Sequence, residues 1–150
     1  MATVLDNVAF MRAVDATAAG QTDVTGATID THGYEGVLFC LDIGTLTATQ
    51  VTSMRLQQGT ASDGSNMADI AGSKVGPFAD TDGQKYAIIE VMRPIKRYVR
   101  VIVNRATEDA VINGGVALLY GTRNSPAMQC TTAGGVACSK VLVSPEEGTP

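Results

Sequence analysis

The chain is poor in the residues on which most active sites depend. Its 150 residues include no tryptophan, one histidine and three cysteines, and aromatic residues make up 5% of the sequence. The single histidine, His32, excludes a metal site built from several imidazoles and leaves one candidate base for a serine or cysteine nucleophile. The scarcity of aromatic rings also argues against a carbohydrate-binding surface, because sugars are commonly held by stacking on exposed rings.

Several signatures of catalysis and nucleic-acid binding are missing as well. The sequence has no glycine-rich phosphate loop, no nucleophile elbow and no aspartate series with the spacing of a helix-loop-helix calcium site. We therefore predict that the protein is not an enzyme and holds no cofactor and no metal. Its net charge of −4 argues against a nucleic-acid partner, since such proteins usually carry a basic excess.

Targeting and membrane-spanning segments are not apparent. Met1 to Asp6 lacks the basic flank of a signal peptide, and the apolar stretch Val8 to Met11 is far too short to cross a bilayer. The sequence thus predicts no membrane partner and a protein that is made and kept soluble in a cytoplasm.

The three cysteines have different settings. Cys40 lies in the apolar run Gly36 to Ile43, which predicts a buried, inert thiol and disfavours a catalytic pair with His32. Cys130 and Cys138 flank a segment with an Ala-Gly-Gly core that could reverse the chain and bring the two sulfurs together. A reducing cytosol opposes a Cys130–Cys138 disulfide, so it remains open whether the bridge forms, which could also happen later, on release.

What the sequence does contain is a series of short β-prone runs. Tyr86 to Met92, Arg97 to Asn104 and Gly115 to Tyr120 are rich in Val, Ile and Tyr and follow one another with almost no room for helices. Turn-forming clusters such as Gly59 to Ser65 and Asp80 to Gly83 separate such runs. This rhythm predicts an all-β fold, either an antiparallel β-sandwich or a jelly roll or small barrel.

The length of the chain favours a single domain. Residues 1–25 are expected to form an extended N-terminal arm or an edge strand, and residues 26–143 the β core. Residues 144–150, with two prolines and a glycine, are expected to be a mobile tail. The continuous apolar run Val37 to Ile43 predicts a strand covered on both faces.

The strand at Arg97 to Asn104 combines core-forming and charged positions. Side chains alternate across a sheet, so Val99, Val101 and Val103 should face one side, and Tyr98, Arg100 and Ile102 the other. Five of the eleven basic residues cluster on or beside this strand: Arg93, Lys96, Arg97, Arg100 and Arg105. They could form a solvated face paired with carboxylates such as Glu90, or dock onto acidic groups of another subunit. Arg97 and Arg100 are the strongest interface candidates.

Three segments of the chain resemble a family of small virion structural proteins of tailed bacteriophages. The segments are IDTHGYEGVLF from Ile29 to Phe39, KRYVRV from Lys96 to Val101, and VALLYGTRNSPA from Val116 to Ala127. Family members show a similar Asp-Thr-x-Gly-Tyr-Glu turn, a later Lys-Arg-Tyr-Val-Arg strand, and an apolar strand that ends in Gly with a nearby Pro. The matching positions here are Asp30, Thr31, Gly33, Tyr34, Glu35, Lys96, Arg97, Tyr98, Arg100, Gly121 and Pro126. The chain departs from the pattern at Thr122-Arg123, where members often have His-Pro.

This resemblance implies a decoration, or cement, protein on the outer capsid surface of a phage head. The implied partner is the major capsid protein, with assembly in the host cytoplasm and a location in the virion. A homo-oligomer is expected, and a trimer would suit shell positions of threefold symmetry. A role at the head-tail joint or in the tail, or as a β-sandwich module that binds a ligand or host surface, remains the alternative.

Overall fold

The computed structural model describes residues 3–123, 127, 129 and 133–142, and its architecture is almost entirely β. The elements in chain order are α1 Val4–Asn7, β1 Val8–Val14, β2 Thr17–Gly20, β3 Val24–Thr25, β4 Ile29–Asp30, β5 Gly36–Leu46, β6 Val51–Gly59, β7 Ala68–Asp69, the 3-10 helix η1 Asp80–Asp82, β8 Tyr86–Met92, β9 Tyr98–Ala106 and β10 Ala110–Tyr120.

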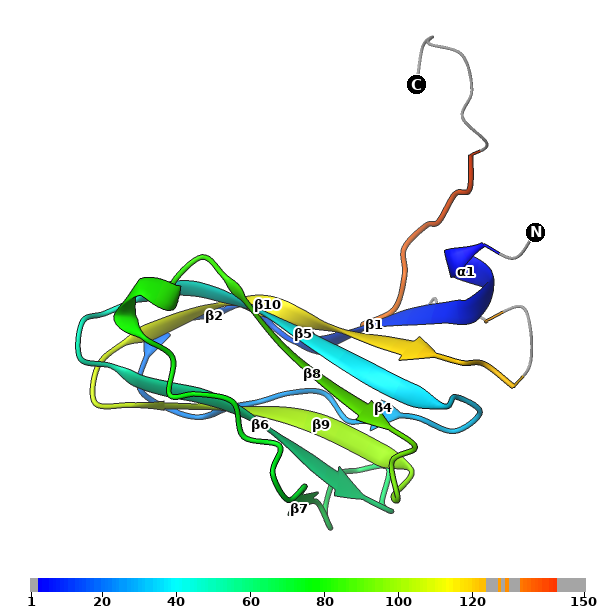
Figure 1. The fold of residues 1–150 in the computed structure, drawn as a ribbon, viewed down its shortest axis with the longest axis horizontal. Helices are drawn as coiled ribbons and strands as arrows, with labels where there is room; N and C mark the ends of the chain where they lie inside the picture. The colour runs from blue at the N-terminus through cyan, green and yellow to red at the C-terminus, as the bar shows by residue number, and fades with distance from the viewer. Residues whose placement is uncertain (1–2, 124–126, 128, 130–132, 143–150) are drawn as a thin grey trace, which may run out of the picture.

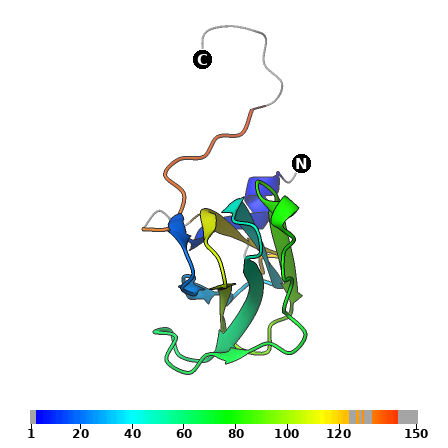
Figure 2. The same cartoon turned by 90° about the vertical axis from the view of Figure 1, so that its left-hand side faces the viewer.

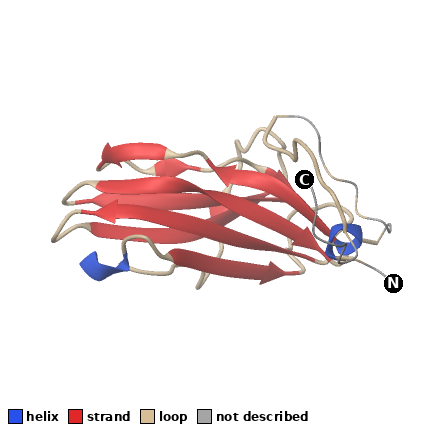
Figure 3. Cartoon of the chain, turned by 90° about the horizontal axis from the view of Figure 1, so that it is seen from above, coloured by secondary structure: helices blue, strands red, loops and turns tan. Residues whose placement is uncertain are grey.

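The strands form two antiparallel sheets that pack face to face (Figures 1 and 2). Sheet A has the order β1-β10-β5-β8, with β2 also paired to β10. Sheet B has the order β3-β9-β6-β7, with β4 also paired to β9. The longer strands of both layers run lengthwise through the molecule, and the two short helices lie at opposite ends (Figure 3). The predicted all-β antiparallel sandwich is confirmed.

The core between the sheets is built by alternate residues of the long strands. Val99, Val101 and Val103 of β9 are at most 1% exposed, as the alternation predicts. They pack in one cluster with residues of sheet A such as Phe39 and Leu41, both at most 1% exposed. Each such fully buried side chain contributes roughly 1.5–3 kcal/mol relative to an exposed one.

The N-terminal segment is an edge strand of sheet A. Residues Val8–Val14 of β1 pair with β10, and Ala9 and Ala13 are buried in the core. Gln129 and Gly134, which follow β10 in the sequence, bond to the free side of β1. The side-chain amide of Gln129 accepts a hydrogen bond from the Phe10 N–H (3.2 Å) and donates one to the Val8 carbonyl (2.6 Å). This part of the chain therefore belongs to the sheet rather than to an extended arm, whereas the predicted tail at residues 144–150 lies outside the described residues.

Two sequence-based expectations about neighbours are wrong. β8 and β9 are consecutive but belong to different sheets, so Glu90 does not lie beside the basic strand β9. The strand β5 is covered on one face only, because Leu38 and Cys40 on its outer face are half-buried, while Val37, Phe39 and Leu41 are in the core. In the part of the chain that the structure describes, no helix is long and apolar enough to span a membrane.

Candidate docking surface at the basic end of the sandwich

Three strands of sheet A bring distant parts of the chain together at one end. The register pairs Tyr120 at the end of β10 with Gly36 at the start of β5, and Gly36 with Met92 at the end of β8. The residues just beyond these positions therefore meet, and they enclose a hollow of about 460 Å³. We call this region the basic end; its lining residues are Thr31, His32, Gly33, Tyr34, Glu35, Arg93, Pro94, Ile95, Lys96, Arg97 and Arg123.

Arg93, Lys96 and Arg123 have exposed side chains on backbones that are held in place. The Arg93 N–H donates to the Glu35 carbonyl (2.7 Å), and the Arg123 N–H donates to the Gly33 carbonyl (2.9 Å). Among the described residues, no carboxylate lies within ion-pair distance of these three side chains. The basic end thus presents three cations without a carboxylate partner in the described part of the chain, on a protein whose net charge is −4.

Arg97 is also at the basic end, but its charge is already neutralised. Its Nε and Nη2 donate to the two carboxylate oxygens of Asp30 at 2.9 and 2.7 Å, a bidentate pair. The guanidinium carbon lies 5.2 Å from the centre of the Tyr98 ring, within the range of a cation-π contact. Arg97 therefore serves mainly to join β4 to the start of β9, and the prediction that it leads the interface finds no support in its geometry.

The Asp30–Arg97 pair should be visible in a pH titration. The hydrogen bond from Arg97, assisted by the His32 N–H, lowers the pKa of Asp30 below its ordinary value of 3.8. Because the folded pKa is depressed, the stabilisation is present above the unfolded pKa and is lost as the pH falls through the folded pKa. Carboxyl-carbon NMR should give a low pKa for Asp30, and Arg97→Gln should raise it towards 3.8. An Asp30 pKa that does not change in Arg97→Gln would contradict the pairing.

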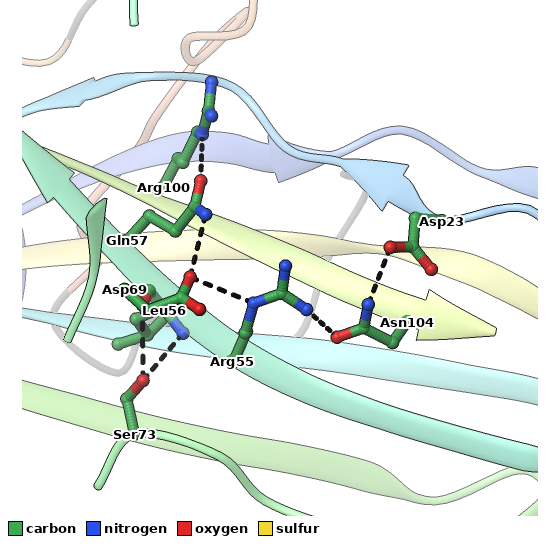
Figure 4. Close-up of polar contacts among 8 residues, drawn as sticks. All are labelled: Asp23, Arg55, Leu56, Gln57, Asp69, Ser73, Arg100 and Asn104. Carbon is green, nitrogen blue, oxygen red and sulfur yellow. Dashed lines mark hydrogen bonds and ion pairs between the residues drawn. The ribbon is translucent and has the colours of Figure 1, made fainter. Parts of the chain in front are cut away.

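Arg100 lies on the outer face of sheet B, in a chain of polar contacts that crosses the sheet (Figure 4). Its Nε donates to Gln57 Oε1 (2.9 Å), and the Gln57 amide donates to Asp69 Oδ1 (2.8 Å). Asp69 also accepts from Arg55 Nε at 3.0 Å. These hydrogen bonds, first from Gln57 and then from Arg55, lower the pKa of Asp69. We call this chain of contacts the polar row.

The polar row continues from Arg55 to Asn104 and ends at Asp23, whose Oδ2 accepts from the Asn104 amide at 2.6 Å. Its members satisfy one another across β6, β7 and β9, so the outer face of sheet B offers few unused donors. Besides its bond to Gln57, Arg100 makes a long contact of 3.5 Å from its Nη1 to the Gly64 carbonyl. Its guanidinium is therefore already engaged within sheet B, and docking onto a partner would have to replace these contacts.

Arg105 is not on the surface, so its assignment as an interface residue is wrong. Its side chain is 4% exposed, and its guanidinium donates to three backbone carbonyls. Nε reaches Thr22 O at 2.7 Å, and Nη1 reaches Ala18 O at 2.8 Å and Ala110 O at 2.7 Å. Arg105 has the same strand parity as Val99 and the other inward valines, a signal in the sequence that indicates an inward side chain.

The outer face of sheet A is a second surface feature. A groove of about 540 Å³ is lined there by Phe10, Arg12, Cys40, Tyr86 and Val116, among others. Burial, with a smaller contribution from Asp42, raises the pKa of the Cys40 thiol. Cys40 and His32 line different hollows, so the structure does not bring them together.

The structure does not test the candidate Cys130–Cys138 disulfide. Cys138 is an exposed free thiol, whereas Cys130, and with it the Cys130–Cys138 pair, lies outside the described residues.

Comparison with known proteins adds no assignment. Neither protein-family models nor curated proteins match this chain. Within residues 3–123 and the described positions that follow, no group of three or more His, Cys, Asp or Glu side chains could hold a metal ion. The basic end and the outer face of sheet A are thus the surfaces from which a function can be inferred.

Proposed function

We propose that the protein is a non-enzymatic structural component of a tailed-phage virion that decorates the outer surface of the head. It binds the major capsid protein through the basic end and so stabilises the shell. The observation that carries the proposal is the set of three exposed cations, Arg93, Lys96 and Arg123, without carboxylate partners in the described structure. The resemblance of the turn at Asp30 and the strand at Lys96 to small virion proteins agrees with this role.

The basic end suits docking onto carboxylates of a shell subunit. Arginine forks bind carboxylates in a planar, bidentate way that fixes orientation, and a lysine adds a mobile point charge. Each exposed ion pair contributes only about 0.2–1 kcal/mol. A homo-oligomer that engages several shell subunits at once gains avidity over many copies, so weak single contacts are sufficient.

The copy number of the protein in purified virions tests this proposal. For a decoration protein, quantitative mass spectrometry should give a copy number close to that of the major shell subunit, in virions of the phage that encodes the chain. A ratio of a few per cent would place the protein at the head-tail joint or in the tail instead. Absence from virions would contradict a structural role.

A ligand or host-surface binding module is the second candidate, and the groove on the outer face of sheet A favours it. Tyr86 is 67% exposed there, and Phe10 lines the same groove, so two rings are available for stacking. A glycan array probed with the wild type and with Tyr86→Ala separates the two candidates. Binding that depends on Tyr86 would support the module, and an array without any signal would favour decoration.

A further inference from the structure

The free edge of β8 exposes unused backbone groups. The Ile43 N–H donates to the Lys85 carbonyl at 2.9 Å, and the Arg93 N–H donates to the Glu35 carbonyl at 2.7 Å. Hydrogen-bonded pairs alternate along an antiparallel ladder, so every second residue between Lys85 and Arg93 is bonded to β5. The N–H and C=O groups of the intervening residues point away from the sheet, and the described residues supply no partner for them; these are Tyr86, Ile88, Glu90 and Met92.

The same edge also exposes large apolar side chains. Tyr86 is 67%, Ile88 56% and Met92 75% exposed, and all three project from the outer face of sheet A. Native proteins usually protect an edge strand with lysine, proline, a bulge or a covering segment, since a bare edge invites pairing. β8 contains none of these devices, and Glu90 is its only charge.

The other long edges of the sandwich are covered. Gln129 and Gly134 bond along β1, where the Arg12 N–H donates to the Gly134 carbonyl at 2.6 Å. Beside β6, Val75 exchanges two backbone hydrogen bonds with Met54, at 2.9 and 2.8 Å. Among the long edge strands, β8 is thus the one whose outward backbone groups lack a partner in the described part of the chain.

We propose that β8 pairs with β8 of a second copy, antiparallel and across a two-fold axis, so that two A sheets become one. A two-fold edge contact is isologous, so β8 must be complementary to itself. In three registers, the outward-facing residues of one β8 lie opposite outward-facing residues of the other, and most of the two strands is paired. They place Ile88, Ile89 or Glu90 on the axis.

The charges of the strand select one of these registers. An axis at Glu90 places two carboxylates directly opposite each other, and an axis at Ile89 places Lys85 opposite Arg93; both arrangements are destabilising. An axis at Ile88 places Ile88 opposite itself and Tyr86 opposite Glu90, with no like charges opposed. The pair is therefore centred on Ile88, with an apolar contact in the middle.

This pairing is independent of the proposed function and gives a two-fold dimer. It differs from the trimer that threefold shell symmetry suggests, so the mass of the full-length protein in solution decides between them. Analytical ultracentrifugation should give twice the chain mass of 15.6 kDa. A monomer at all concentrations, or a trimer, would overturn the proposal.

Two charge variants locate the contact. Ile88→Lys opposes two ammonium groups on the axis and should raise the dimer dissociation constant about tenfold or more, with an unchanged circular dichroism spectrum. Val116→Lys is the matched control, because Val116 is 42% exposed on the same outer face but lies in β10, away from the edge. Dissociation by Val116→Lys and not by Ile88→Lys would show that the face, rather than the edge, is the contact.

Cysteine cross-linking tests the register and does not depend on the lysine variants. Cys40 is the cross-strand neighbour of Ile88, so the background must carry Cys40→Ser, together with Ser at the other two cysteines. Ile88→Cys should form an intermolecular disulfide under mild oxidation. A mixture of Tyr86→Cys and Glu90→Cys proteins should cross-link to each other, while each alone should not. Failure of Ile88→Cys to cross-link, or self-linking of Glu90→Cys, would overturn this register.

Discussion

Replacing Arg105 with alanine is expected to lower the free energy of unfolding by about 3 kcal/mol. The guanidinium is buried and bonds the carbonyls of Thr22, Ala18 and Ala110. It thereby fastens the β2–β3 segment and the start of β10 to β9. The loss of the donor leaves these carbonyls without a charged partner, two of them in a partly buried setting and one fully buried.

Urea denaturation measures this effect, and Arg100 supplies the control. Arg100→Ala removes an arginine from the same strand but from the outer face, where one side-chain contact and one long carbonyl contact are lost. Its cost should be about 1 kcal/mol or less. Arg105→Lys should also destabilise, because an ammonium group cannot reproduce the fork that spans three carbonyls. Equal midpoints for the Arg105→Ala and Arg100→Ala proteins would contradict the anchoring role.

Reversal of charge at the basic end should nearly abolish capsid binding and leave the fold unchanged. In the double variant Arg93→Glu, Lys96→Glu, two attractive contacts become repulsive, which we expect to weaken the affinity per copy about 100-fold. The residual binding should also depend less on salt than wild-type binding does. Co-sedimentation of the protein with capsids that lack it, over a range of salt concentrations, measures both effects.

A control with the same change in net charge separates a specific site from general electrostatics. Lys74→Glu, Lys140→Glu alters two exposed cations that line neither the basic end nor the groove on the outer face of sheet A. If both double variants lose binding equally, the basic end is not the docking surface. If neither loses binding, the exposed cations are not involved, and the apolar outer face of sheet A becomes the candidate.

The fold could be predicted from the sequence wherever local pattern and tertiary packing agree. The alternation of Val99, Val101 and Val103 gave the inner face of β9, and turn-forming clusters separated several of the strands. Sheet membership could not be predicted in this way. The short connection Arg93 to Arg97 suggests a hairpin, yet it passes from sheet A to sheet B. In a sandwich, the packing of both sheets, rather than the length of a connection, determines where the next strand is placed.

The candidate site could be predicted only in part from the sequence, because strand register decides which residues meet there. Arg93 and Lys96 were identified because they lie next to the basic strand, but Arg123 joins them only through the register that brings the end of β10 beside the start of β5. The sequence favours Arg97 and Arg100 as interface residues, because their acceptors, Asp30 and Gln57, lie 67 and 43 residues away along the chain and are not apparent from the local pattern. The sequence thus shows where basic residues cluster, but the pairing of the strands determines which of them find acceptors.

The covering of β1 by Gln129 and Gly134 limits how far copies of this chain can polymerise. A sandwich with two bare edges could add further copies at each edge and grow into a ribbon. With β1 covered in every copy, the β8 pairing that we propose joins two copies and leaves no second bare long edge on sheet A among the described residues. By occupying backbone groups of β1, the Gln129 side chain would limit assembly through sheet A to a dimer.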